Sequence, residues 1–226
     1  DLDAIARLWA HDTSLWPDTP GARDLIATRL DWLEAPAIMA GQLAAISEAH
    51  TRAIREGVTH IVLLGMGGSS LAPDVMVRVA GTASGAGAGT GRLALRMLDS
   101  VSPAAIRRAC TDMAHALVVV ASKSGSTIEP TVLAANARRL MEEACGAPWA
   151  DRFVAVTDPA THLARTASEL GYRDVWLNPP DIGGRYSALS LFGLVPAGLA
   201  GVQVDTVLAS GAAMAATPST SAAPGR

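Results

Sequence analysis

The sequence predicts an α/β fold: a three-layer domain with a five-stranded parallel sheet and helices on both faces, preceded by an N-terminal helical segment. Short apolar runs alternate with helix-like segments from residue 60 onward, as in a series of β-α-β units. Half of the 226 residues are hydrophobic and only 4% are aromatic. This composition favours closely packed α/β layers over an aromatic-rich β-sandwich.

The first 56 residues are predicted to be helical. Apolar residues recur near helical spacing over residues 2–9 and 24–33. A third helix is expected to begin at Pro36 and to end before Gly57, a residue type suited to helix C-termini. The tryptophans of this segment are interpreted as helix-packing residues: Trp9, Trp16 and Trp32.

Five apolar runs are predicted to form the sheet: 60–64, 93–98, 116–121, 153–157 and 174–177. Helices are expected between them: 71–80, 103–109, 127–145 and 159–170. Connections of this length between strands imply right-handed crossovers and parallel pairing. Periodicity does not fix the order of the strands in the sheet.

Charge and cysteine content exclude several classes of function. The net charge is −3 and no basic stripe is evident, so no nucleic-acid partner is expected. Cys110 and Cys145 lack metal-site spacing and suit reduced thiols of a cytoplasmic protein. The uncharged stretch 186–204 contains Pro196 and several glycines, so it is interpreted as a buried helix and not as a membrane span.

The loop over residues 122–127, Ser-Lys-Ser-Gly-Ser-Thr, carries the strongest functional signal. It follows a predicted buried strand and precedes a predicted helix. Hydroxyls, the Lys123 ammonium and a helix N-terminus therefore converge where α/β sheets bind ligands. These are the groups that a phosphate requires.

Helix capping is the alternative interpretation of this loop. Ser126 and Glu129 match a capping box, although capping by Thr127 would place Pro130 more comfortably in the first turn. Capping alone explains one hydroxyl and Glu129. It does not explain a lysine among several small hydroxyls, which favours ligand binding.

A glycine-rich turn, residues 65–70, follows the first strand. It is either a ligand-binding turn or a tight strand-to-helix connection. It partly fits the dinucleotide fingerprint, with Ser70 in the place of the third glycine, and Asp99 could bind a ribose. An NAD-dependent oxidoreductase is therefore kept as a remote alternative.

A second glycine-containing turn, Ile-Gly-Gly-Arg-Tyr-Ser, spans residues 182–187. Its Arg185 enters an otherwise apolar segment. Arg185 either stabilises negative charge that develops on a substrate oxygen or extends into solvent from a helix start. His60 and His115 adjoin strands and are interpreted as structural, and Asp158 as a loop or capping residue.

Three motifs in order resemble the phosphoglucose isomerase family, which is built from sugar-isomerase (SIS) domains. They are the Gly-Gly-Ser turn at 67–69, the loop at 122–127 and the Gly-Gly-Arg-Tyr-Ser segment at 183–187. Residues 7–16 look like the lead-in to the isomerase half of bifunctional transaldolase/phosphoglucose isomerases. The resemblance implies a helical lead-in over 1–56, a phosphosugar-binding SIS domain over 57–182, and a segment over 183–226 that begins the connection to a missing second SIS domain.

The resemblance also implies a function: isomerisation of glucose 6-phosphate and fructose 6-phosphate through a cis-enediolate, without metal or cofactor, in a homodimer. In the family pattern Gly68 lets the substrate approach the backbone, Arg185 stabilises the enediolate and Glu129 orients the loop. The residues that would hold the sugar phosphate are Ser69, Ser122, Lys123, Ser124 and Thr127.

In the family, the catalytic glutamate lies in the second SIS domain. The resemblance implies that this sequence is C-terminally truncated and lacks that domain. The chain is therefore predicted to bind a phosphosugar without converting it. A non-catalytic SIS sensor of phosphosugars is the main alternative.

Overall fold

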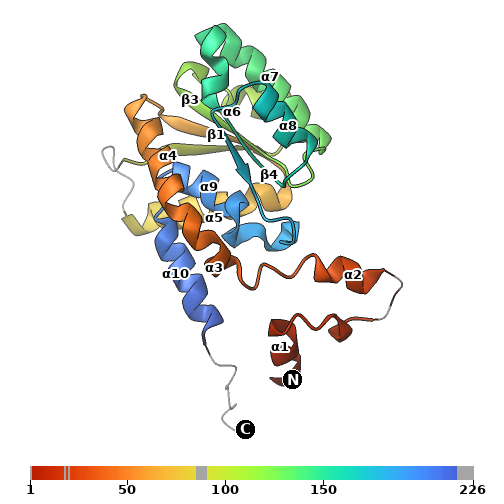
Figure 1. Ribbon diagram of the computed structural model, residues 1–226. Helices are drawn as coiled ribbons and strands as arrows, with labels where there is room; N and C mark the ends of the chain where they lie inside the picture. The colour runs from red at the N-terminus through yellow and green to blue at the C-terminus, as the bar shows by residue number, and fades with distance from the viewer. Residues whose placement is uncertain (1, 18, 20, 85–90, 218–226) are drawn as a thin grey trace.

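The computed structural model describes residues 2–17, 19, 21–84 and 91–217. Its centre is a five-stranded parallel sheet in the order β2-β1-β3-β4-β5, with helices on both faces (Figure 1). The strands are β1 (His60–Gly65), β2 (Ala94–Leu98), β3 (Ala116–Ala121), β4 (Phe153–Thr157) and β5 (Asp174–Leu177). The predicted fold class is confirmed.

The central strands are held in register, so their carboxyl ends meet at one edge. His60 pairs with Ala94 on β2 and with Ala116 on β3, and every residue of β1 and β3 is buried. Strands buried on both faces read as continuous apolar runs, which is why these two were recognisable in the sequence.

Two layers of helices cover the sheet. The helices are α1 (Leu2–Trp9), α2 (Ala22–Ala27), α3 (Ala35–Met39), α4 (Leu43–Arg55), α5 (Leu71–Ser84), α6 (Pro103–Ala109), α7 (Ile128–Cys145), α8 (His162–Glu169), α9 (Leu191–Leu199) and α10 (Val204–Ala215). Ile61 and Leu63 of β1 pack with α4 and α9, whereas Val62 and Leu64 pack with α6 and α7. The alternation follows from the two-residue period of a strand.

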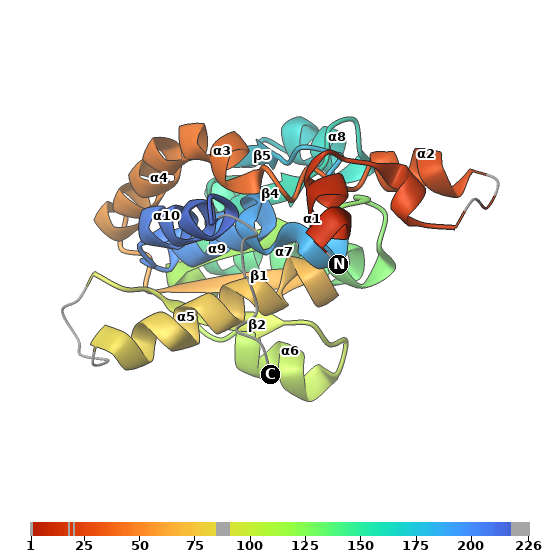
Figure 2. The same ribbon diagram turned by 90° about the horizontal axis from the view of Figure 1, so that it is seen from below.

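Helix α9 is buried along its whole length. It lies between α4 and α5 (Figure 2), and a Cβ atom at Gly198 would collide with Ile46 of α4. The buried helix predicted within 186–204 is therefore confirmed, over a shorter range. Among the described residues, no helix is long and apolar enough to cross a membrane.

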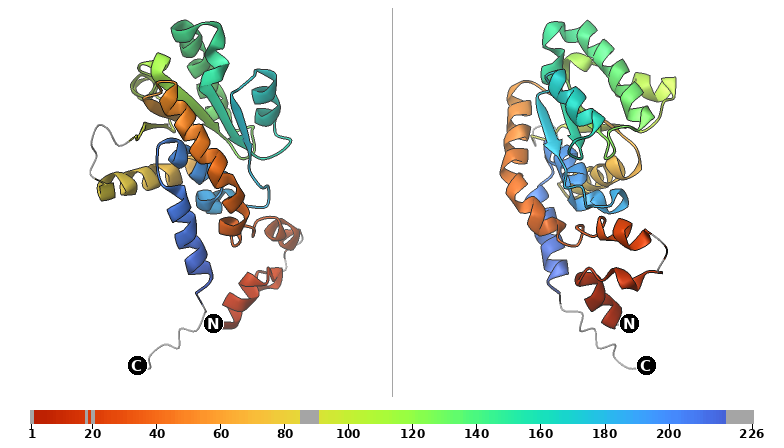
Figure 3. Two further views of the ribbon diagram at one scale, coloured as in Figure 1. Left: turned by 60° about the vertical axis from the view of Figure 1, so that its left-hand side comes forward. Right: turned by 45° about the vertical axis from the view of Figure 1, so that its right-hand side comes forward.

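The helix predicted over 24–33 is wrong in its second half. Helix α2 ends at Ala27, because Leu30 forms an antiparallel bridge with Ile182 and the Asp31 N–H donates to the Asp181 carbonyl at 3.2 Å. Figure 3 shows α1 and α2 outside the layers around the sheet, joined to α3 by this non-helical segment.

Trp32 lies in the same non-helical segment and does not pack within a helix as predicted. Its ring stacks on Tyr186, with centroids 5.1 Å apart and planes 18° apart. The lead-in segment thus contacts the Gly-Gly-Arg turn twice, through a backbone bridge and through an aromatic pair.

Candidate functional site

Three turns meet at the carboxyl edge of the sheet and enclose a pocket of about 200 Å³. They follow β1, β3 and β5. The pocket is lined by Met66, Gly68, Ser69, Ala121, Ser122, Lys123, Ser124, Thr127, Pro130 and Gly184. The structure thus brings together every residue that was predicted to hold a phosphate, from two loops more than fifty residues apart in the sequence.

The hydroxyls of the 122–127 loop form a cluster at the start of α7. Ser122 Oγ donates to Thr127 Oγ1 at 3.4 Å, and Ser124 Oγ lies 3.3 Å from the same atom. Thr127 occupies the N-cap position, but its side chain makes no capping hydrogen bond, and the Ser126–Glu129 capping box does not form. The first N–H groups of α7 therefore stay free of side-chain caps, which leaves donors for an anion.

Gly125 fixes the shape of this loop. Its φ is +63°, in the left-handed region, and a Cβ atom there would lie 2.5 Å from Cβ of Thr161. Thr161 in turn caps α8, since its Oγ1 accepts from the Ala164 N–H at 3.1 Å. Only glycine suits both the backbone conformation and the close approach of α8.

Lys123 ties three loops together. Its ammonium donates to the carboxylate of Asp158, after β4, and to the Pro180 carbonyl, after β5, at 2.7 Å. The Lys123 and Asp158 side chains are only 22% and 14% exposed. Burial raises the pKa of Asp158, and the hydrogen bond from Lys123 opposes that rise.

Asp158 was interpreted from the sequence as a loop or capping residue, and the structure corrects this, because its carboxylate is the counterion of Lys123. An anion that enters the pocket would share the Lys123 ammonium with Asp158. No sequence signal joined these two residues, which lie on different strand ends.

The two glycine turns are in direct backbone contact. A Cβ atom added at Gly68 would overlap the Gly184 carbonyl oxygen and lie 3.0 Å from its carbon. The Ser187 hydroxyl lies 2.7 Å from the Gly184 carbonyl oxygen and 3.2 Å from that of Gly68. The resemblance gave Gly68 a role toward substrate, and the structure adds a role in docking the second turn.

Arg185 and Glu129 lie outside the wall of this pocket. The Arg185 side chain is exposed, follows the pocket residue Gly184 directly, and makes no hydrogen bond or ion pair within the described part of the chain. Glu129 lies half-buried in the first turn of α7, likewise without such a partner there. Asp99 lines a different pocket, with Arg96 and Arg108.

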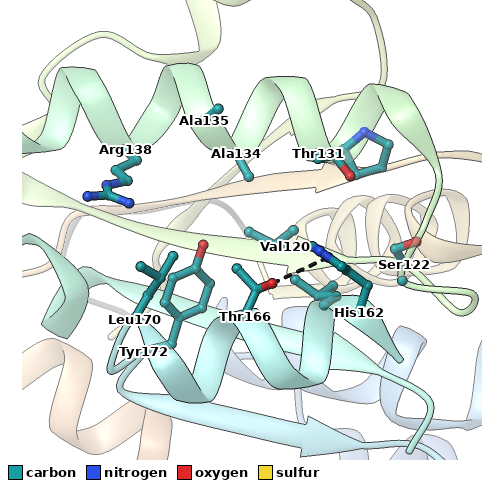
Figure 4. A pocket seen from close by; sticks show the side chains of 13 residues that line it. Val120, Ser122, Thr131, Ala134, Ala135, Arg138, His162, Thr166, Leu170 and Tyr172 are labelled. Carbon is teal, nitrogen blue, oxygen red and sulfur yellow. Dashed lines mark hydrogen bonds between the residues drawn. The ribbon is translucent and has the colours of Figure 1, made fainter. Parts of the chain in front are cut away.

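A second hollow lies behind the loop, between α7 and α8, with a volume of about 190 Å³ (Figure 4). Ser122 and Pro130 line both pockets. His162 Nδ1 lies 3.3 Å from Thr166 Oγ1 on its α8 wall. Burial raises the pKa of Tyr172 to about 12, so its hydroxyl stays neutral at the far end.

Comparison with known proteins places these motifs in a family context. The family model described as phosphoglucose isomerase matches residues 43–224. A glucose-6-phosphate isomerase of Parasynechococcus marenigrum is 31% identical over 216 residues, covering 93% of this chain and 36% of that protein. One from Geobacter sp. strain M21 is 37% identical over 155 residues, covering 67% and 28%. The chain thus spans only 36% and 28% of the length of these two curated relatives.

Solved structures agree with the sequence matches. A hypothetical protein of Thermus thermophilus superposes with a TM-score of 0.74 at 29% identity, over 92% of this chain and 45% of the other. A glucose-6-phosphate isomerase from Chlamydia trachomatis gives 0.63 at 26% identity, over 95% and 38%.

Proposed function

This chain belongs to the phosphoglucose isomerase family, and we propose that it forms the phosphate-binding part of a glucose-6-phosphate isomerase. The observation that supports this most is one pocket in which four hydroxyls, of Ser69, Ser122, Ser124 and Thr127, accompany the Lys123 ammonium. Hydroxyl donors, a cation and a helix N-terminus suit a dianionic phosphate. Two matched relatives carry the name glucose-6-phosphate isomerase.

In this proposal the phosphate of the sugar sits on the hydroxyl cluster at the start of α7. Lys123 contributes charge from the side, held in place by Asp158 and the Pro180 carbonyl. Glu129 is proposed to orient the first turn of α7, where a carboxylate favours the helix dipole. The sugar then extends from the pocket toward Gly184 and Arg185.

Arg185 is proposed to stabilise the cis-enediolate. Isomerisation moves a proton between C1 and C2 of the open-chain sugar. When one of these carbons loses its proton, its C–H electron pair forms the C=C bond and negative charge develops on the carbonyl oxygen of the other carbon. A guanidinium with no competing partner in the described residues can reorient toward that oxygen.

We propose that the proton-transferring base comes from polypeptide outside this chain. Such a step requires a base in hydrogen-bond reach of the substrate. None of the residues that line the phosphate pocket has a carboxylate or an imidazole, and Asp158 is already bound to Lys123. The chain alone should therefore bind a phosphosugar without isomerising it.

Titration calorimetry with 6-phosphogluconate tests the binding site, with gluconate as the matched ligand that lacks the phosphate. We expect binding heat with 6-phosphogluconate and none with gluconate. Lys123→Ala should weaken the binding of 6-phosphogluconate. Equal binding of both ligands would contradict a phosphate site. NAD, added in a separate titration, should give no heat.

The missing base also favours a second candidate, a non-catalytic SIS domain that senses phosphosugars. Joining this chain to the remaining part of an isomerase relative distinguishes the two. A fusion that converts fructose 6-phosphate, and loses turnover more than binding with Arg185→Ala, supports the enzyme. A fusion that binds but never turns over supports the sensor. A homodimeric, cytoplasmic enzyme is proposed for the complete protein, and sedimentation analysis of the fusion tests the dimer.

A further inference from the structure

A second polar pocket lies at the opposite edge of the sheet, before the amino ends of β1, β4 and β5. Its volume is about 590 Å³. It is lined by Arg52, Glu56, Cys145, Pro148, Asp151, Arg152 and Arg173, and we call it the arginine pocket. Three guanidinium groups thus converge from three separate segments of the chain, away from the phosphosugar pocket.

Two of these arginines are paired but not fully satisfied. Arg173 donates through Nη2 to Glu56, and Arg52 donates through Nη2 to Asp174. The Arg173 side chain is only 9% exposed, yet its Nη1 is buried without an acceptor among the described residues, as is Nε of Arg52. Buried donors of this kind are costly unless an acceptor is supplied.

The third arginine has no acid partner in the described part of the chain. Arg152 is half-buried, and its Nη1 is buried with no acceptor there. Asp151, the remaining carboxylate of the wall, is exposed and makes no ion pair with any described residue. The carboxylates of Glu56, Asp151 and Asp174 balance the three arginines in formal charge. Each guanidinium nevertheless keeps an N–H group without an acceptor among the described residues.

We propose that the arginine pocket binds a small phosphate-bearing anion, at a site separate from the phosphosugar pocket. Guanidinium forks match phosphate oxygens in geometry and charge. A tetrahedral phosphate offers oxygens in several directions and can meet three forks that come from three segments, whereas a planar carboxylate meets fewer. The volume suits a ligand of metabolite size more than a bare ion.

Cys145 supplies a local reporter, because it lines this pocket while the other thiol, Cys110, does not. The probe is inorganic pyrophosphate, with citrate as the carboxylate comparison and sodium chloride at matched ionic strength. The Lys123→Ala variant is used throughout, so that occupancy of the phosphosugar pocket is reduced. The rate of thiol labelling at each cysteine is measured by mass spectrometry.

Pyrophosphate should slow labelling of Cys145, leave Cys110 unchanged and act at lower concentration than citrate. Arg152→Ala, which breaks no ion pair with a described residue, should raise the pyrophosphate concentration needed by about tenfold, the loss of one charge-assisted contact. Arg107→Ala is the matched control, since Arg107 is exposed on α6 and lines no part of this pocket.

Three results would overturn the proposal. Protection of Cys145 equal to that given by sodium chloride would mean that no anion site exists. Equal weakening by Arg152→Ala and Arg107→Ala would reduce the effect to net charge. Stronger protection by citrate than by pyrophosphate would contradict the choice of phosphate.

Discussion

Gly68 and Gly184 touch backbone to backbone, although 115 residues separate them in the chain. The carbonyl oxygen of Gly184 occupies the space in which a side chain at position 68 would begin. The contact joins the turn after β1 to the turn after β5, and both line the candidate phosphate pocket. The shape of that pocket therefore depends on the absence of a single methyl group.

Gly68→Ala should open this contact. We expect a loss of about 1–3 kcal/mol in the free energy of unfolding, as for overpacked sites, together with weaker binding of 6-phosphogluconate. Gly81→Ala on α5 is the control, because a Cβ atom there meets nothing within 4 Å. Chemical denaturation and calorimetry measure the two effects. Unchanged affinity in Gly68→Ala would show that the contact does not shape the pocket.

Gly125→Ala should displace the 122–127 loop from α8. Gly146→Ala is a matched variant, because Gly146 also has a positive φ, of 71°, but an added Cβ atom there meets nothing within 4 Å. Both should suffer backbone strain of about 1–3 kcal/mol. Only Gly125→Ala should also lose affinity for 6-phosphogluconate, measured by calorimetry, since its Cβ atom would press on Thr161. Equal affinities of Gly125→Ala and Gly146→Ala for 6-phosphogluconate would show that Gly125 does not shape the binding site.

Lys123→Ala should destabilise the protein in a pH-dependent way. It leaves the Asp158 carboxylate largely buried without its cation, which costs about 1–3 kcal/mol near neutral pH. The pKa of Asp158 is already raised and should rise further, so the folded state holds its proton more tightly than the unfolded state. The extra loss should therefore grow as pH increases through the raised pKa and shrink in acid.

Denaturant titrations of Lys123→Ala at several pH values check this, with Lys123→Ala/Asp158→Asn as the control. The double variant has no buried carboxylate at this position, so its loss of stability should not contain the pH-dependent contribution. If both proteins respond to pH alike, Asp158 is not the counterion that the structure shows.

Trp32→Ala should loosen the Gly-Gly-Arg turn. The stack on Tyr186 contributes about 0.5–1.5 kcal/mol beyond the buried area, and Tyr186 lies two residues after the pocket residue Gly184. We expect lower stability and weaker binding of 6-phosphogluconate. Trp9→Ala, at a tryptophan that is 41% exposed, should leave affinity unchanged. Fluorescence denaturation and calorimetry separate the two readouts.

His60 should make the protein sensitive to mild acid. It is 1% exposed, and burial, followed by repulsion from Arg96, lowers its pKa below the usual 6.5. The unfolded state therefore binds a proton first, and stability should fall by up to about 1.4 kcal/mol per pH unit below about pH 6.5. His60→Leu should flatten this part of the pH profile. Parallel profiles for the two proteins would assign the acid sensitivity to other groups.

Local patterns in the sequence predicted most of the fold. The strands β3, β4 and β5 and the helices α6 and α7 have, to within one residue, the bounds that their apolar runs and flanking residues predicted. Strands β3 and β4 follow from their own composition, because all of their residues are buried and a strand buried on both faces needs a continuous apolar run. The helix predicted over 24–33 was wrong because Leu30 pairs with Ile182, and no local pattern encodes a partner so distant.

The site divides in the same way. Ser122, Lys123 and Thr127 could be proposed together from the sequence because they lie in one loop at a strand end. Asp158 and Trp32 were misread because each acts on a residue of another segment, Lys123 and Tyr186 respectively. Those pairings depend on strand order, which periodicity does not give.

Helix α9 restricts where this protein could be cut. All of its residues are enclosed by neighbours, and α4, from the lead-in, packs in the same cluster. A protein fragment of residues 57–182 alone would lack α4 and α9. The apolar face of the sheet that these helices cover would then be exposed to water. Expression trials should therefore keep the segment from α3 to α10 intact, and fusion partners belong at its two ends.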